Sequence, residues 1–129
     1  MANWQDVEEA VALLPGTEPS TAYGQRAWRV RKKLLVWERP LRKADRDALG
    51  PGAPSGAIVG LPTEDADEAN DLITAFPDVF FTTPHFDGYA AVLTRLDALP
   101  LGLLQHLVRA AWLRSAPKAL VKGFVAEGR

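Results

Sequence analysis

A dense block of basic residues is the feature of this sequence best suited to binding a charged ligand. Residues 26–46 carry nine Lys or Arg and two acids, a net charge of +7. Guanidinium and ammonium groups make the charge-assisted hydrogen bonds that hold phosphate oxygens. We therefore expect weak, salt-sensitive binding of nucleic acid, directed mainly at phosphates. The expected contact residues, including two later lysines, are Arg26, Arg29, Arg31, Lys32, Lys33, Arg39, Arg42, Lys43, Lys118 and Lys122.

A second stretch with chemical potential reads F-F-T-T-P-H-F-D-G-Y, residues 80–89. It sets His85, one of two histidines, beside the aromatic residues Phe86 and Tyr89. Such a cluster offers stacking surfaces and an imidazole that titrates near neutral pH. The alternative functional hypothesis is an adaptor that binds a protein or a small ligand in a pocket around these three residues. A histidine that only hydrogen-bonds a neighbouring loop would explain the same position without a ligand.

Catalytic and metal-binding chemistries have little support. None of the three serines lies in the Gly-x-Ser-x-Gly elbow of a hydrolase. The chain has no cysteine, and the 21-residue separation of His85 and His106 fits no common metal-ligand spacing. The acids of residues 64–71 could bind a hard cation weakly, but a solvated helix face explains the same residues. We therefore predict a non-enzymatic module with no catalytic residue, no metal site and no cofactor.

Length and composition predict a single domain over residues 1–129. Hydrophobic residues make up 47% of the chain, which is enough for a genuine core. The start, M-A-N-W-Q-D-V-E-E, lacks the basic and then apolar segments of a secretory signal. No apolar run approaches the ~18–20 residues that span a bilayer. We expect a cytoplasmic protein that makes no membrane contact, and we leave its oligomeric state and any protein partner open.

Charge is sorted along the chain, although the net charge is only −1. Residues 1–25 carry four acids and residues 47–94 carry eight, and neither segment has a base. Residues 95–129 carry six bases and two acids. The acidic segment 47–94 would keep the opposite face of the protein away from DNA. The pI of 6.1, however, is far from that of the strongly basic domains that typically bind nucleic acid.

The basic block has to be positioned by a β-hairpin. Residues 26–38 read as two runs of strand-forming residues with a tight turn between them. The turn holds Arg31 and Lys32, which do not suit the positive φ of a two-residue turn. If the hairpin forms, its tip projects these two residues and Lys33 as a basic wing. The competing interpretation is a solvated hairpin whose charges pair with the acids of residues 64–71.

A second hairpin is predicted around Asp87-Gly88, because both positions tolerate positive φ. Its register would pair Phe86 with Tyr89 and Thr82 with Leu93. This turn accounts for Asp87-Gly88 without any chemistry.

The remaining elements follow from hydrophobic periodicity and from the signals at their ends. Helices are expected over residues 3–14 (with Asn3 and Asp6 as a capping box), 40–49, 63–76, 100–114 and from Pro117 onward. A further strand is expected over residues 57–61, and loops over 18–24 and 50–56. Because strands and helices do not alternate regularly, we predict an α+β fold with an antiparallel sheet and helices packed on one face.

Most of the aromatic residues are expected to serve the core. Trp28, Trp37 and Trp112 occur at strand or helix spacing, although stacking on nucleic-acid bases is the competing interpretation. Tyr89, next to the predicted turn, is the best candidate for exposure.

Several motifs, in order along nearly the whole chain, resemble the MmcQ/YjbR family. They are L-P-G at 14–16, Y-G at 23–24, W-R-V with Lys33, P-D-V-F-F-T-T-P-H-F-D-G-Y at 77–89, L-D at 96–97, Trp112, and A-P-K at 116–118. The resemblance implies a CyaY-like fold, the architecture of frataxins, and DNA binding through a double-wing arrangement. Such family members usually have Gly in the hairpin where this chain has Lys32, a departure that adds charge at a candidate contact.

Overall fold

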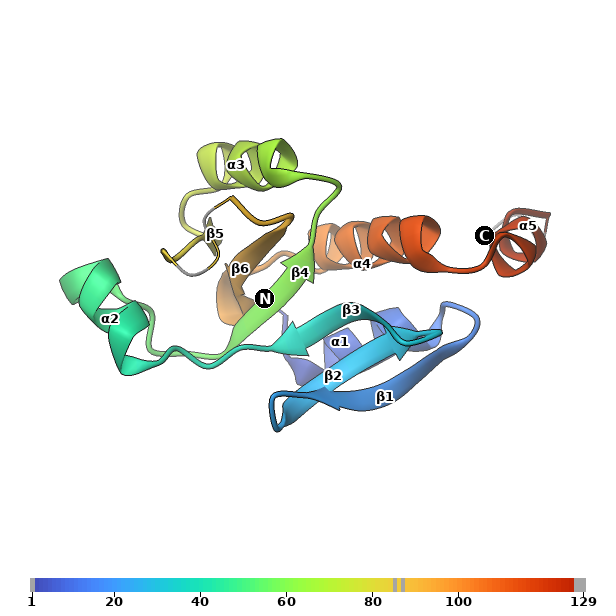
Figure 1. Cartoon of the computed structure of the whole chain (residues 1–129), viewed down its shortest axis with the longest axis horizontal. Coiled ribbons are helices and arrows are strands. Elements are labelled where there is room, and N and C mark those ends of the chain that lie inside the picture. Colours follow the sequence, from blue (N-terminus) through green and yellow to red (C-terminus); the bar gives the residue numbers. More distant parts are fainter. Residues whose placement is uncertain (1, 85, 87, 127–129) are drawn as a thin grey trace.

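A six-stranded antiparallel sheet organises the molecule (Figure 1). The structure is a computed structural model that describes residues 2–84, 86 and 88–126. Its helices are α1 (Trp4–Ala12), α2 (Lys43–Leu49), α3 (Ala66–Ala75), α4 (Leu101–Ser115) and α5 (Lys118–Ala126). Its strands are β1 (Thr17–Ala22), β2 (Gln25–Val30), β3 (Lys33–Glu38), β4 (Ile58–Pro62), β5 (Phe80–Phe81) and β6 (Ala91–Arg95). The strand order is β1-β2-β3-β4-β6-β5, which confirms the predicted α+β class.

Helix α1 begins with the capping box read from the sequence. The Asn3 side chain accepts a hydrogen bond from Asp6 N–H, and the Asp6 carboxylate accepts one from Asn3 N–H, both at 2.9 Å. Each bond satisfies a backbone donor that the first turn of a helix leaves unpaired.

The hairpin predicted over residues 26–38 is formed by β2 and β3. Val30 pairs with Lys33, so the connection is the two-residue turn Arg31-Lys32. Arg31 has φ 48° and Lys32 has φ 74°, so these residues adopt the positive φ that they were expected to disfavour. The turn therefore carries local strain that a glycine would relieve.

The prediction of a loop over residues 18–24 was wrong for most of that segment. Residues 17–22 form β1, an edge strand that pairs along its whole length with β2. Its side chains are mostly polar and only Ala22 is buried, so hydrophobic alternation gave no signal. Pro19 is tolerated because an edge strand has one side without ladder hydrogen bonds. Pairing of the backbone, rather than burial of side chains, makes this segment a strand.

The register predicted for the second hairpin was also wrong. Phe81, not Thr82, pairs with Leu93, and β5 is only two residues long. The chain then leaves the sheet through local turns, in which Phe86 N–H donates to Thr83 O and Tyr89 N–H donates to Phe86 O. Pro84 has no N–H for the ladder, which favours this early exit. His85 and Asp87 lie outside the described residues.

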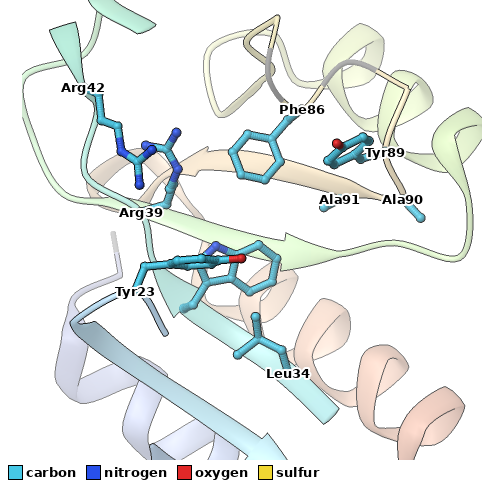
Figure 2. Close-up of a pocket in the computed structure, with 9 residues that line it drawn as sticks. Tyr23, Leu34, Arg39, Arg42, Phe86, Tyr89, Ala90 and Ala91 are labelled. Carbon is cyan, nitrogen blue, oxygen red and sulfur yellow. The ribbon is translucent and has the colours of Figure 1, made fainter. Parts of the chain in front are cut away.

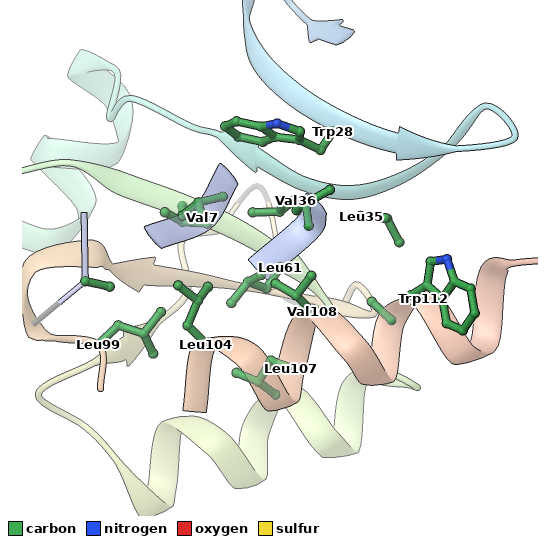
Figure 3. Packing of buried hydrophobic residues seen from close by; sticks show 14 of the residues in the cluster. Val7, Trp28, Leu35, Val36, Leu61, Leu99, Leu104, Leu107, Val108 and Trp112 are labelled. Carbon is green, nitrogen blue, oxygen red and sulfur yellow. The ribbon is translucent and has the colours of Figure 1, made fainter. Parts of the chain in front are cut away.

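One face of the sheet carries the main core (Figure 3). Side chains of α1, α3, α4 and α5 pack there against β2, β3, β4 and β6. Trp112 is fully buried, and its indole N–H donates to Pro15 O at 2.9 Å. Trp28 and Trp112 therefore serve the core, as expected.

The other face of the sheet is only partly covered. Ile58, Phe81 and Leu93 pack there under Leu41 and the C-terminal end of α2. Ala27 and Trp37 lie further along the same face, where none of the helices that the structure describes packs against them. This uncovered half of the second face forms the floor of a hollow.

Candidate ligand-binding surfaces

The basic block does not form one surface. Helix α2, with Lys43, lies at one end of the long axis of the molecule (Figure 1). The turn with Arg31 and Lys32 lies toward the other end, because β3 separates the two. The predicted nucleic-acid set is thus divided between two separate regions of the molecule.

Three arginines of the predicted set are engaged within the fold. Arg26 pairs with Glu38 at 3.2 Å. Arg29 donates to the Ser20 hydroxyl and to the carbonyl oxygens of Thr21 and Lys32. Its hydrogen bond to Lys32 O, at 3.0 Å, links the strained turn to the side chain of a residue in β2.

Arg39 is the third of these, because it is buried beside Asp45. Its guanidinium lies 3.1 Å from the Asp45 carboxylate and also donates to Pro40 O. Burial by itself would raise the pKa of Asp45, but the hydrogen bond from Arg42 N–H and the charge of Arg39 outweigh it and hold that pKa below its ordinary value. Arg39 is a structural cation rather than a surface contact for nucleic acid.

The hairpin tip and α5 bring five predicted cations to one end of the molecule. A Cβ on Gly16 would lie 2.7 Å from the Leu120 side chain and 3.8 Å from Val30, so α5 packs beside the end of β2. We name this region the basic end. Its exposed members are Arg31, Lys32, Lys33, Lys118 and Lys122.

The acids of residues 64–71 do not neutralise the basic end. They lie in or just before α3, which packs near β5 and β6. These two strands are at the opposite edge of the sheet from β1 and β2. Within the described part of the chain the only ion pairs are Arg26–Glu38 and Arg39–Asp45. The interpretation in which the hairpin pairs with these acids was therefore wrong.

The second candidate surface is the hollow over the uncovered half of the sheet, which we name the Trp37 pocket (Figure 2). Its volume is about 600 Å³. Arg39 and Arg42 lie at one side of the pocket. Phe86 and Tyr89, from the segment before β6, form a second side. Tyr23 and Leu34 lie across the pocket from Phe86 and Tyr89. The full lining is Tyr23, Leu34, Trp37, Arg39, Arg42, Phe86, Tyr89, Ala90 and Ala91.

Trp37 forms the floor of this pocket because its cross-strand partner is Gly60. A Cβ on Gly60 would overlap the indole ring, so only glycine lets the ring lie against the neighbouring strand. Trp37 is thereby held largely buried, with part of its surface in the pocket. The residue expected to serve the core also serves a potential binding surface.

Two aromatic residues stand at the rim. Tyr23 is 90% exposed and has φ 53° in the two-residue turn between β1 and β2. Tyr89 is more than half exposed, as expected, and contacts Phe86 edge-on with ring centroids 6.1 Å apart. Phe86 also lies under Arg39, whose guanidinium carbon is 5.3 Å from the ring centroid.

The predicted pocket around His85, Phe86 and Tyr89 thus has two of its three residues in the lining of one hollow. His85 lies outside the described residues. Sequence reasoning missed Tyr23, Leu34 and Trp37 as members of this site. The Y-G dipeptide at 23–24 indicated a turn at Tyr23. No pattern in the sequence indicated that Gly60 would lie opposite Trp37 and leave room for its indole ring.

Among residues 2–84, 86 and 88–126, no group of three or more His, Asp or Glu side chains is arranged to hold a metal ion. None of the helices in these residues combines the length and apolar character needed to cross a bilayer.

The antiparallel sheet, with a helix layer on one face and a partly open second face, defines a class of small α+β domains. The YjbR family model matches residues 12–114, and the chain belongs to the YjbR family. It is 50% identical over 129 residues to two proteins, and each match covers 98% of both chains. They are the Uncharacterized protein Mb2600 of Mycobacterium bovis and the Uncharacterized protein Rv2570 of Mycobacterium tuberculosis.

A solved structure shows the same fold. The crystal structure of Deinococcus radiodurans protein DR2400, a DUF419 domain, matches with a TM-score of 0.66 at 18% identity. The match covers 95% of this chain and 88% of that one. The family resemblance read from the motifs is thereby confirmed, together with the fold.

Proposed function

We propose that this protein is a non-catalytic module that binds the nucleic-acid backbone through its basic end. The observation that carries this proposal is the gathering of Arg31, Lys32, Lys33, Lys118 and Lys122 at one end of the molecule. None of the five makes an ion pair within the described part of the chain. Exposed cations that lack an internal partner are the groups that replace condensed counterions on a phosphate backbone.

The strained turn supports the same proposal. Arg31 and Lys32 occupy a conformation that favours Gly, Asn or Asp, and both residues are exposed there. Strain of this kind persists where the surroundings impose it, and it concentrates at binding sites. Arg29 supplies the constraint through its bond to Lys32 O. The turn therefore presents two cations beyond the end of the sheet, with Lys33 behind them.

The expected mode of binding is weak and tolerant of sequence. Phosphate contacts position a protein on a duplex but carry no base information directly. Five available cations predict that log K falls with log salt at a slope of about −3 to −5. The arginines engaged in the fold, Arg26, Arg29 and Arg39, are expected to add little to this slope.

The experiment is a fluorescence-anisotropy titration with labelled single- and double-stranded oligonucleotides over a range of salt concentrations. One variant carries Lys32→Glu with Lys33→Glu. Its matched control carries Lys43→Glu with Arg46→Glu, which makes the same change in net charge at the α2 end. The proposal predicts that the first variant loses binding while the control retains most of it. Absence of binding by the parent at low salt, or equal losses in both variants, would refute it.

A further inference from the structure

We infer that the Trp37 pocket binds a small planar aromatic molecule that carries a carboxylate or phosphate. This site is separate from the basic end and does not depend on the proposed binding of nucleic acid. The inference rests on the size of the pocket, its rigid aromatic floor, one available guanidinium and a strained aromatic residue at the rim.

The size and lining of the pocket suit a small molecule. A volume of about 600 Å³ lies within the usual range for ligand sites, which are mostly apolar with a few placed polar groups. Four aromatic side chains and two arginines contribute to the lining. A flat ring system could stack on these aromatic surfaces, whereas a flexible aliphatic chain would gain less from them.

The floor is formed before any ligand arrives. Gly60 leaves space on the neighbouring strand, and the Trp37 indole occupies it. Because both residues belong to paired strands, the indole does not have to be ordered at the moment of binding. A preformed surface lowers the conformational entropy lost on association.

The charges at the pocket favour an anion. Arg39 is already paired with Asp45 at 3.1 Å. The Arg42 side chain is exposed, and its guanidinium makes no hydrogen bond or ion pair with any described residue. Among the described residues no carboxylate lines the pocket. Arg42 also feels the charge of Asp45, but that carboxylate is bound by Arg39, so the Arg42 guanidinium keeps its hydrogen-bond donors for a ligand. Guanidinium groups bind carboxylate and phosphate through two parallel hydrogen bonds.

Tyr23 provides an independent indication. A bulky residue at φ 53° is strained, and at 90% exposure Tyr23 recovers almost nothing by packing against the protein. Asn at this position would give Asn-Gly, the pair that such a turn favours most. A tyrosine held in this turn at the edge of the pocket is best placed to cover one side of a bound ring (Figure 2).

The test uses the full chain labelled with ¹⁵N and follows the indole N–H resonances of its tryptophans by NMR. Trp37→Phe assigns the resonance of Trp37. Four probes separate the parts of the inference: 2-naphthoate, 2-naphthyl phosphate, the neutral alcohol 2-naphthalenemethanol, and cyclohexanecarboxylate. The two aromatic anions are expected to shift the Trp37 resonance saturably. They should bind at least about tenfold more tightly than the neutral ring or the aliphatic anion. The stronger of the two identifies carboxylate or phosphate as the preferred group.

Two variants test the assigned roles. Arg42→Gln is expected to lower the affinity for the aromatic anion by about tenfold and to leave that for the neutral alcohol unchanged. Tyr23→Asn is expected to raise the melting temperature by a few degrees while it weakens binding of both aromatic anions. The matched control, Lys32→Gly, relieves strain in the other turn and should leave probe binding as it is in the parent.

The site would be refuted by the absence of any saturable shift of Trp37, or by an unchanged affinity for the anionic probes in Arg42→Gln. A variant with Lys32→Glu and Lys33→Glu separates this inference from the proposed function. It should retain probe binding even where binding of oligonucleotides is lost.

Discussion

Trp37 and Gly60 face each other across neighbouring strands, and the indole occupies the space that a side chain at position 60 would need. This relationship holds the floor of the pocket in place and joins β3 to β4 near the middle of the sheet. A close aromatic–glycine pair of this kind stabilises a sheet that would otherwise have a gap at the glycine.

Replacement of Gly60 by Ala should therefore be costly. The added methyl group would force the Trp37 ring or the strand to move, and overpacking of this kind costs about 1–3 kcal/mol. Chemical denaturation followed by far-UV circular dichroism measures the loss. Gly102→Ala is the control, because a Cβ at that position of α4 would meet no other described part of the chain within 4 Å, apart from its own helix backbone and its sequence neighbours. An equal stability of Gly60→Ala and the parent would contradict the close contact.

Replacement of Lys32 by Gly should stabilise the protein. Glycine removes the steric penalty of φ 74° at the second turn position, worth about 1 kcal/mol. The hydrogen bond from Arg29 to the carbonyl of residue 32 is retained because it involves the backbone. Calorimetry should show a melting temperature raised by a few degrees. A lower melting temperature would mean that the lysine side chain makes a stabilising contact that outweighs the strain.

Replacement of Asp45 by Asn should strongly destabilise the segment that leads into α2. The change would leave the buried Arg39 guanidinium without its counter-charge, which costs about 3 kcal/mol or more. Denaturant unfolding at neutral pH gives the difference. Asp47→Asn, on an exposed part of the same helix, is expected to be nearly neutral. Similar values for the two variants would show that the Arg39–Asp45 pair contributes little.

The same carboxylate should make stability depend on acid. The folded-state pKa of Asp45 is lowered, so the stabilisation is fully present above the unfolded-state pKa of about 3.9. It is lost as pH falls through the lowered folded-state pKa. Unfolding free energies measured between about pH 6 and pH 2 should fall less steeply for Asp45→Asn than for the parent. Parallel curves would rule out Asp45 as a source of the acid sensitivity.

Local sequence determined much of the fold. The Asn3–Asp6 cap, the apolar stripe of α4 and the two apolar runs of the β2–β3 hairpin depend on neighbours within a few residues. Such contacts follow from backbone geometry and side-chain periodicity, so the pattern of residues predicts them. The motifs from L-P-G to A-P-K also identified the family, because they specify turns and packing positions in a fixed order.

Tertiary structure decided the features that depend on distant partners. β1 is a strand because β2 offers it a complete backbone ladder, not because its own side chains alternate. The basic block is divided because β3 carries its two halves to opposite ends of the molecule (Figure 1). The Trp37 pocket exists because Gly60, 23 residues further along the chain, becomes the cross-strand neighbour of Trp37. Strand pairing alone brings these residues together, and no local pattern specifies which strands will pair.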